Sequence, residues 1–392
     1  MSVYDAIIVG AGPAGSTLAY RLARANLKVL LLEREKMPRV KPCGGGIDGL
    51  FMRNLPEEME VETVIEATAT ETIVRYQGRQ QGRYPLPEPI HMTQRRWLDQ
   101  WLMLQAREAG ANVLEGFKVT RAAGQDEEGL CRVWGPDATF AARFLVGADG
   151  AYSTVARQVG LPTALDRRWR NTFVASEWDV EVLPSQQREY GDKAVIDCSV
   201  SPLGYGWIFP KTDHLNVGFG VPYKKARTLR VATDSFLKTR SGLVGWPQCN
   251  YAHWIPFARV GAPVMKGNAL LVGDAAGVCD PATGAGISWG VKSSRLAAGA
   301  IIPAIKEQRW AEALEHYQRA IRRLQLELQA GAALRNLLIL GFALRGRLWE
   351  APFLQVLEVL SGRGDYLSWA AKHPWQYQVG MAVQKLMVDR LI

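Results

Sequence analysis

A glycine-rich turn lies between a buried strand and a helix near the N-terminus. Residues 4–9 are mostly apolar and predict a short strand, and residues 16–26 carry apolar side chains at helical spacing. The turn between them reads Gly10-Ala11-Gly12-Pro13-Ala14-Gly15, and a second apolar strand over residues 29–32 ends at Glu33. A strand, a G-x-G-x-x-G turn, a helix, a strand and an acid in this order indicate a βαβ unit that binds a dinucleotide.

Each position of this unit has a physical reason. Gly10 permits the tight turn, Gly12 lets the backbone approach a pyrophosphate, and Gly15 lets the helix pack on the strand. The helix N-terminus offers free N–H groups to the phosphates, and Glu33 is placed to accept hydrogen bonds from ribose hydroxyls. The alternative is a tight turn without a ligand. We expect nucleotide contacts from Gly10, Gly12, Ala14, Gly15, Glu33 and Arg34.

Two later apolar strands each end at an aspartate. Asp149 follows the strand expected over residues 143–147, and Asp274 follows the strand expected over residues 269–272. Ligands bind at this edge of α/β sheets, and Asp274 is the better candidate for a flavin ribityl hydroxyl. In the alternative interpretation, both aspartates are helix N-caps.

The segment after Asp274 predicts a long helix. Residues 281–286 form a Gly-rich turn, and the helix is expected to begin at about Ile287. Its N-terminus, with Gly284, Gly286 and Ile287, is suited to stabilise negative charge on a flavin ring.

Residues 93–99 begin another amphipathic helix, with Leu98 and Leu102 as expected core positions. Arg95 at its start is placed to reach a pyrophosphate. The alternative is an arginine that only faces solvent.

Taken together, these motifs resemble the FAD-dependent para-hydroxybenzoate-hydroxylase-like fold over about residues 3–320. The resemblance implies one FAD and a mixed α/β fold, in which a Rossmann-type FAD-binding domain is interleaved with an antiparallel-sheet substrate domain and followed by C-terminal helices. We expect the FAD-binding domain over residues 1–75, 95–165 and 262–320, the substrate domain over 76–94 and 166–261, and the helical region over 321–392.

Two further segments resemble the geranylgeranyl reductase family. They are Lys41-Pro42-Cys43-Gly44-Gly45-Gly46 and residues 202–211, which contain every fixed position of the family signature P-x-x-Y-x-W-x-F-P. The resemblance implies saturation of isoprenoid double bonds by an FAD-dependent oxidoreductase. Tyr205, Trp207 and Phe209 alternate at period two, so on a strand they share one face and form a wall for a polyprenyl chain. The alternative is an ordinary packed sheet face.

The resemblance also places Cys43, Gly44 and Gly45 near the isoalloxazine ring of FAD. It implies that a hydride passes from reduced flavin to one alkene carbon and that a proton reaches the other. We expect Cys43, Tyr205 and Trp207 to be the catalytic residues, while Tyr205, Cys43 and an ordered water stay open as proton donors. A purely structural thiol at Cys43 is the alternative.

Basic clusters are candidates for binding an acidic head group of the substrate. They are Arg167, Arg168 and Arg170, and Lys224, Lys225, Arg227 and Arg230. Solvated charge is the alternative interpretation for both clusters.

Composition limits the remaining possibilities. The net charge of +9 suits acidic substrates or an anionic surface and does not select nucleic acid. Five widely spaced cysteines without a C-x-x-C pair indicate reduced thiols in a cytoplasmic protein, and five scattered histidines favour no metal site. There is no signal-peptide pattern, and the apolar residues 337–344 are far short of the roughly 20 needed to span a bilayer. The sequence leaves the oligomeric state open.

From about Trp310 the chain predicts helix. Leu334, Leu337, Leu338, Phe342 and Leu344, with Arg335, Arg345 and Arg347, suggest an apolar face edged with cations. We favour packing of this face on the FAD-binding domain over a peripheral position on the inner face of a membrane.

No second G-x-G-x-x-G turn is present, so electrons are expected from transiently bound NADPH or from reduced ferredoxin. Two other classes stay open: an FAD-dependent monooxygenase or halogenase-like enzyme on an aromatic or polyprenyl substrate, and a non-catalytic prenyl-binding carrier.

Overall fold

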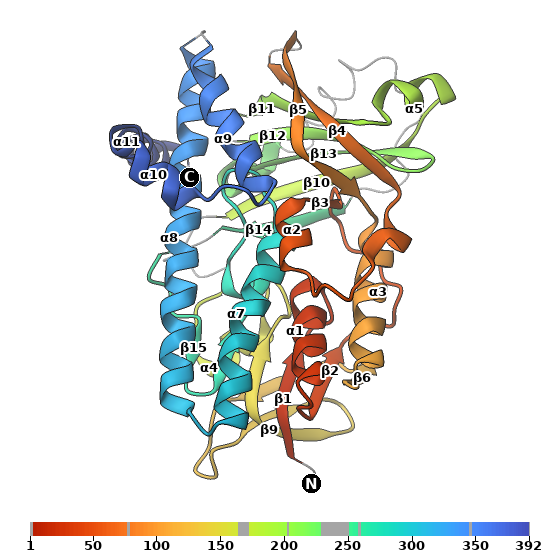
Figure 1. Ribbon diagram of the computed structural model, residues 1–392, viewed down its shortest axis with the longest axis vertical. Coiled ribbons are helices and arrows are strands. Elements are labelled where there is room, and N and C mark those ends of the chain that lie inside the picture. The colour runs from red at the N-terminus through yellow and green to blue at the C-terminus, as the bar shows by residue number, and fades with distance from the viewer. Residues whose placement is uncertain are drawn as a thin grey trace.

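A computed structural model describes residues 3–76, 79–163, 172–201, 204–228, 251–257, 260–344 and 347–391. Its strands form two eight-stranded sheets, and long helices run beside them (Figure 1). The fold is mixed α/β, as the sequence predicts.

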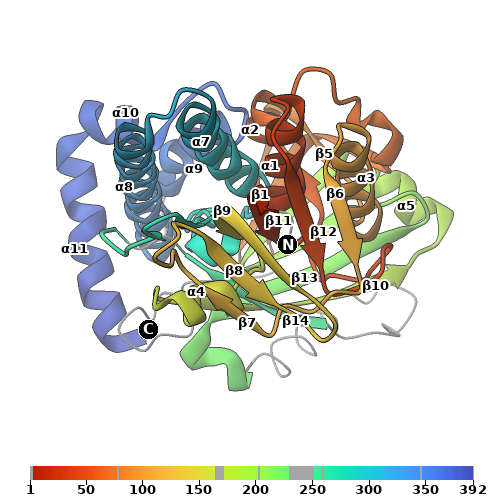
Figure 2. The same ribbon diagram turned by 90° about the horizontal axis from the view of Figure 1, so that it is seen from below.

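The first sheet contains the N-terminal βαβ unit. Its central strands are parallel and buried on both faces, which explains their unbroken apolar sequence. Figure 2 shows α1 (Pro13–Arg24), α3 (Arg95–Glu108) and α7 (Ile287–Lys306) on one face, and the β7–β8 hairpin with α4 (Thr154–Val159) on the other. The strand order is β15 (Met265–Lys266), β16 (Ala269–Leu271), β9 (Thr139–Gly147), β1 (Val3–Val9), β2 (Val29–Glu33) and β6 (Asn112–Glu115), with β8 (Cys131–Trp134) and β7 (Arg121–Ala123) added beside β9.

The second sheet is antiparallel except where β4 and β11 pair in parallel. Its order is β14 (Tyr251–Pro256), β10 (Thr172–Glu181), β13 (His214–Pro222), β12 (Gly204–Pro210), β11 (Lys193–Ser201), β4 (Ala67–Tyr76), β5 (Arg79–Met92) and β3 (Gly46–Ile47). Strands β3 and β4 both belong to this second sheet, because β3 pairs with β5 and β4 pairs with β5 and β11, although they lie within residues 1–75, which were expected in the FAD-binding domain.

Short helices and 3₁₀ turns lie in the connections between the strands and the longer helices. They are α2 (Gly49–Asn54), α5 (Pro184–Tyr190) and the 3₁₀ turns η1 (Val61–Val64), η3 (Tyr223–Thr228), η4 (Gly273–Ala276) and η5 (Arg347–Trp349).

The C-terminal part is helical, as predicted from Trp310 onward. It comprises α8 (Trp310–Ala343), α9 (Glu350–Leu360), α10 (Tyr366–Lys372) and α11 (Pro374–Leu391). In Figure 1, α8 extends from the level of the first sheet to that of the second. Leu334 lies in the main core, and Phe342 packs with Trp349 and Phe353, so this part of the apolar face is covered by protein.

One prediction for this region is wrong. Arg335 does not edge an exposed face, because the turn of α8 that carries it faces inward and leaves the residue only 6% exposed. Arg345 and the side chain of Arg347 lie outside what the structure describes. No helix within the described ranges is both long and apolar enough to cross a bilayer.

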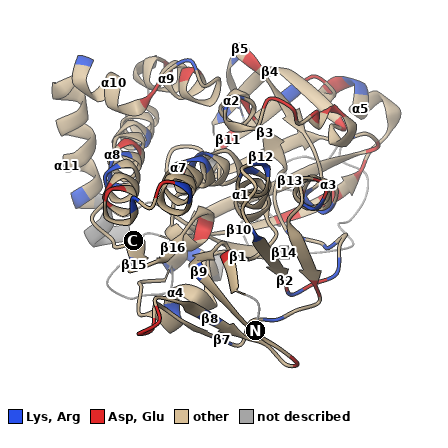
Figure 3. Cartoon of the chain, turned by 60° about the horizontal axis from the view of Figure 1, so that its bottom comes forward, with Lys and Arg blue, Asp and Glu red and all other residues tan. Residues whose placement is uncertain are grey.

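The charges are dispersed. On the side drawn in Figure 3, Lys and Arg residues are interspersed with Asp and Glu residues, and neither sign covers a large area. Cys43, Cys131, Cys198 and Cys279 are free thiols, and Cys249 lies outside the described residues. Among the described residues, no group of three His, Cys, Asp or Glu side chains is arranged to hold a metal ion.

Helix α11 packs tightly against α8 at Gly380, which gives a stability prediction. A Cβ atom at Gly380 would lie 2.4 Å from the carbonyl oxygen of Ala333. We therefore expect Gly380→Ala to destabilise the protein by about 1–3 kcal/mol, measured as a lower midpoint of thermal unfolding. Gly299→Ala is the matched control, since a Cβ there meets no atom within 4 Å and helix propensity alone favours alanine. Equal midpoints for the two variants would contradict this account of the α8–α11 contact.

Candidate active site

A cavity of about 630 Å³ lies between the first sheet, the second sheet and α8 and α9. The start of α1, the segment from Lys41 to Gly46 and the turn from Asp274 to Ile287 line one side. Strands β10, β12 and β14 line the middle. Apolar side chains of β4, β5, α8 and α9 form the far wall, including Tyr76, Leu86, Ile90, Leu338, Phe342, Phe353 and Leu357.

The N-terminal glycine turn is closely packed at two positions and open at a third. A Cβ at Gly15 would lie 1.9 Å from the Gly10 carbonyl oxygen, and Gly10 itself has a φ of +106°. At Gly12 a Cβ would meet nothing nearer than Arg95 and Arg39, at 3.8 and 3.9 Å. Gly12 and Ala14 line the cavity. The backbone of the turn therefore faces the cavity, where Arg95 and Arg39 are the nearest side chains to Gly12.

Glu33 holds this turn in place. Its carboxylate accepts from the Ala11 N–H at 2.8 Å and from the Glu35 N–H at 3.1 Å. Neither Glu33 nor Arg34 lines the cavity, and Arg34 is exposed beside Glu35 at 3.5 Å.

Arg95 faces the turn and not solvent. It makes two hydrogen bonds to Asp99, of 2.7 and 2.8 Å, and both side chains are buried. Burial opposes its charge, but the Asp99 carboxylate outweighs burial and raises the pKa of Arg95. Arg39 also lies 3.0 Å from Asp99 and 3.7 Å from Glu33. The sequence did not predict Arg39, because it sits in an irregular loop with no motif around it.

The two predicted aspartates differ in position. The Asp149 carboxylate accepts from Ser153 Oγ and Thr154 N, both at 2.6 Å, so it serves the start of α4. Asp274 lines the cavity, 3.9 Å from the Lys41 ammonium, and faces Gly286 at the start of α7. No side chain caps the N-terminus of α7, so its N–H groups remain available to a ligand.

Two buried charged residues hold the Cys43 loop. The Cys43 N–H donates to Glu177 Oε1 at 2.6 Å. The Lys211 ammonium donates to the carbonyl oxygens of Gly44 at 2.8 Å and Thr93 at 2.7 Å. Gly45 approaches so closely that a Cβ there would lie 1.9 Å from the Thr93 carbonyl oxygen. The thiol of Cys43 accepts from the Gly45 N–H at 3.4 Å.

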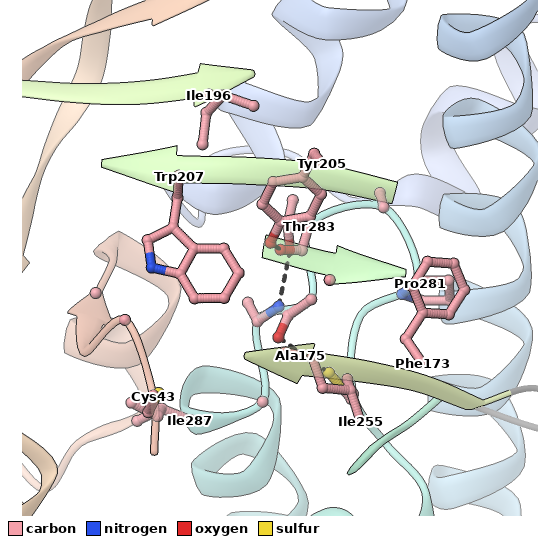
Figure 4. A pocket seen from close by; sticks show the side chains of 18 of the residues that line it. Cys43, Phe173, Ala175, Ile196, Tyr205, Trp207, Ile255, Pro281, Thr283 and Ile287 are labelled. Carbon is pink, nitrogen blue, oxygen red and sulfur yellow. Dashed lines mark hydrogen bonds between the residues drawn. The ribbon is translucent and has the colours of Figure 1, made fainter. Parts of the chain in front are cut away.

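The structure confirms that the three aromatic side chains of β12 share one face. Tyr205, Trp207 and Phe209 all line the cavity, with neighbouring ring centroids 6.1 and 6.3 Å apart. Figure 4 shows Tyr205 and Trp207 side by side on β12, with Cys43 and Ile287 toward one end and Pro281 and Phe173 toward α8. Pro202, the first residue of the signature, lies outside the described residues.

Both polar groups on this face already have partners. The Tyr205 hydroxyl donates to the Thr283 carbonyl oxygen, and Trp207 Nε1 donates to Asn216 Oδ1 at 2.8 Å. Burial raises the pKa of Tyr205 far above its usual value. Close by, the Cys279 thiol donates to the Gly284 carbonyl oxygen at 3.1 Å.

Glu177 is a cavity residue that the sequence did not predict. It shares the inner face of β10 with Phe173 and Ala175 and is 8% exposed. Burial raises the pKa of Glu177 to about 7, against the opposing effect of the Cys43 N–H. The sequence does not single it out, because Asp179 and Glu181 follow it at the same period-two spacing on β10.

His253 and Arg335 also line the cavity without having been predicted as site residues. Burial, and then Lys41, lower the pKa of His253 to about 4, so the ring is neutral at pH 7.

Of the two predicted head-group clusters, the structure describes the side chains of Lys224 and Lys225. Both are exposed and do not line the cavity. Arg167, Arg168, Arg170, Arg230 and the side chain of Arg227 lie outside what the structure describes.

Comparisons with known proteins agree with this arrangement. Residues 3–198 match the family model described as FAD binding domain, and residues 185–244 match the geranylgeranyl reductase catalytic domain. An uncharacterised protein of Methanosarcina barkeri is 30% identical over 88% of this chain and 87% of its own. A geranylgeranyl diphosphate reductase of Rhodobacter capsulatus is 30% identical over 79% of this chain and 78% of its own.

Among solved structures, a geranylgeranyl bacteriochlorophyll reductase-like protein of Thermoplasma acidophilum has a similar fold. The TM-score is 0.75 with 22% identity, over 99% of both chains.

Proposed function

This chain belongs to the geranylgeranyl reductase family, and we propose that it is an FAD-dependent reductase that hydrogenates the C=C bonds of a geranylgeranyl-type chain. One observation carries the proposal. A single cavity has the Gly12 turn, Lys41 and Asp274 on one side and the aromatic face of β12 beside them, so a cofactor and an apolar chain can meet within it.

The residues around Gly12 fit the phosphates of FAD. Helix α1 has no acidic residue in its first turn and no side-chain cap, so its N–H groups are free for a pyrophosphate. Arg39 and Arg95 border the same space, and Asp274 with the N-terminus of α7 fits the ribityl chain and the electron-rich edge of the ring. When bound, FAD supplies the hydride for the reduction.

The aromatic face fits the substrate. Tyr205, Trp207 and Phe209 offer flat apolar surface, and the polar atoms of Tyr205 and Trp207 are already satisfied. An unactivated alkene accepts a hydride poorly, so the proton must arrive before or with it. A dry aromatic wall protects the positive charge that then develops on carbon.

Glu177 is our choice for the proton donor. It is the one carboxyl group that the described strands of the second sheet present to the cavity, and it touches the backbone of Cys43. Its carboxylic O–H bond breaks as the new C–H bond forms, and the carboxylate regains a proton from solvent. Tyr205 is less suited, because the Thr283 carbonyl oxygen accepts its hydroxyl hydrogen.

The remaining partners are part of the same proposal. Electrons reach the flavin from NADPH or reduced ferredoxin, and the protein works in the cytoplasm on a prenyl substrate that reaches it from a membrane surface. Leu344 and Leu348, which are 61% and 66% exposed at the end of α8 and in η5, support contact with such a surface. Sedimentation with anionic lipid vesicles tests the membrane contact, and protein that stays in the supernatant would refute it.

Anaerobic flavin reoxidation tests the function. The FAD of the purified protein is reduced chemically without oxygen, geranylgeranyl diphosphate is added, and the absorbance of oxidised flavin is followed. We expect reoxidation by the prenyl compound. If no geranylgeranyl compound reoxidises the flavin, while oxygen with substrate does so rapidly, the enzyme is a monooxygenase. A protein that stays colourless after reconstitution with FAD would instead be a prenyl carrier.

A further inference from the structure

Three Lys and Arg side chains line the described part of the cavity: Lys41, Arg95 and Arg335. Lys41 and Arg95 lie on the cofactor side, near Asp274 and Asp99. Arg335 comes from α8 and donates to the carbonyl oxygen of Pro281. In Figure 4, Pro281 and Phe173 lie at the end of the view opposite Cys43 and Ile287. Through this bond to Pro281, Arg335 lies toward the end of the cavity that is away from Cys43.

The hydrogen-bond partners of Arg335 are all neutral. Nη1 donates to the Pro281 carbonyl oxygen at 3.3 Å, and Nε and Nη2 donate to Asn336 Oδ1 at 3.3 and 3.1 Å. The rings of Phe173 and Phe257 lie near the guanidinium, with centroids at 5.8 and 6.0 Å. The ion pairs found among the described residues do not include Arg335.

The carboxylate that acts on Arg335 is that of Asp280, and its oxygens already accept other hydrogen bonds. They accept from the Ala282 N–H and from the hydroxyls of Thr283 and Tyr366, each at 2.8 Å. Asp280 therefore favours the charged form of Arg335 without forming an ion pair with it.

This environment is unfavourable for a charged arginine unless a ligand supplies a negative charge. A buried cation without an ionic partner is costly. Burial lowers the pKa of Arg335 to about 10, which still leaves the side chain charged at pH 7. A guanidinium has five N–H donors in a planar fork, and the three bonds described are long. A fork of this kind matches two oxygens of a phosphate.

We infer that Arg335 binds the phosphate of the prenyl substrate inside the cavity. The head group then lies at α8, and the chain runs along Tyr205, Trp207 and Phe209 toward Cys43. This inference rests on the proposed function and names its substrate class: prenyl chains esterified to phosphate, as a free diphosphate or as a phospholipid.

Equilibrium binding to the oxidised holoprotein tests the inference without turnover. The probes are geranylgeranyl diphosphate, a digeranylgeranylglyceryl phosphate and geranylgeraniol, which has no phosphate. We expect the wild type to bind the phosphate esters roughly 10- to 100-fold more tightly than the alcohol. The ester that binds with the higher affinity shows whether the phosphate belongs to a free diphosphate or to a phospholipid.

Arg335→Gln should remove this preference while leaving the affinity for geranylgeraniol unchanged, because glutamine can still donate to Pro281. Arg335→Lys keeps the positive charge but loses the planar guanidinium, so the preference for phosphate esters should become smaller without disappearing. It also serves if the glutamine variant fails to fold. Arg322→Gln, which removes an exposed cation from the same helix, is the control and should bind as the wild type does.

An unchanged preference in both Arg335 variants, or a wild type that binds alcohol and phosphates equally, would overturn the inference. Failure of the proposed function is distinguishable from this. In that case the head-group preference persists in binding, but no prenyl compound reoxidises the reduced flavin.

Discussion

Replacing Glu177 with glutamine should slow the reoxidation of reduced flavin by a prenyl substrate by roughly 100-fold or more. Glutamine keeps the shape of the side chain and an oxygen that can accept from the Cys43 N–H, a bond of 2.6 Å in the wild type. It cannot release a proton. The loss therefore reports on proton donation rather than on the position of the Cys43 loop.

The pH dependence gives an independent readout. Burial raises the pKa of Glu177 to about 7, with Asp179 acting in the same direction and Lys211 and the Cys43 N–H against it. The protonated form is the donor, so the wild-type rate should be high below pH 7 and should fall as the pH rises through that value. The rate of Glu177→Gln should lack this inflection, as stopped-flow traces between about pH 6 and pH 8 will show.

Two conservative variants serve as controls. Asp179→Asn changes a carboxylate on the same strand that bonds to Asn216. Tyr205→Phe removes one hydroxyl whose hydrogen bond to Thr283 is worth about 1 kcal/mol. Each should lower the rate by less than about tenfold. A collapse in Tyr205→Phe together with a normal rate in Glu177→Gln would place the proton donor at Tyr205.

Replacing Arg95 with methionine should weaken FAD binding by roughly 10- to 100-fold. The variant removes a cation that faces Gly12 and leaves the fully buried Asp99 with less compensation. Breaking a buried ion pair costs about 3–5 kcal/mol, and Arg39, 3.0 Å from Asp99, offsets part of that cost. The thermal midpoint should therefore fall as well.

The measurement is the fluorescence of FAD released on dilution of the holoprotein. Arg96→Met is the matched control, because Arg96 is the next residue on α3 and is exposed. We expect it to bind FAD as the wild type does. Equal losses in the two variants would mean that general positive charge, and not the position of Arg95, retains the cofactor.

Local patterns in the sequence were sufficient for the parts of the site that lie within a few residues of one another. The turn from Gly10 to Gly15 follows from a glycine motif, and the start of α7 at Ile287 and the shared face of Tyr205, Trp207 and Phe209 follow from periods of 3.6 and 2, each within one segment. The same reasoning could not place Asp149, since a capping acid and a ligand-binding acid look alike at the end of a strand.

Residues that reach the site through distant contacts gave no such pattern. Glu177 meets Cys43 across 134 positions, and Lys211 meets Gly44 across 167. Arg335 was predicted at the edge of an apolar face, because a helical pattern gives the relative directions of side chains and not which side the rest of the fold covers.

The origin of the cavity walls has a consequence for how such enzymes diversify. The groups proposed to hold FAD come from chain segments before residue 288, whereas the far wall of the cavity includes α8 and α9. Mutations in those two helices can therefore reshape the space for the substrate while the redox machinery is inherited unchanged. A new preference for a substrate head group can therefore evolve through substitutions in the C-terminal helices alone, while the residues that bind the flavin stay the same.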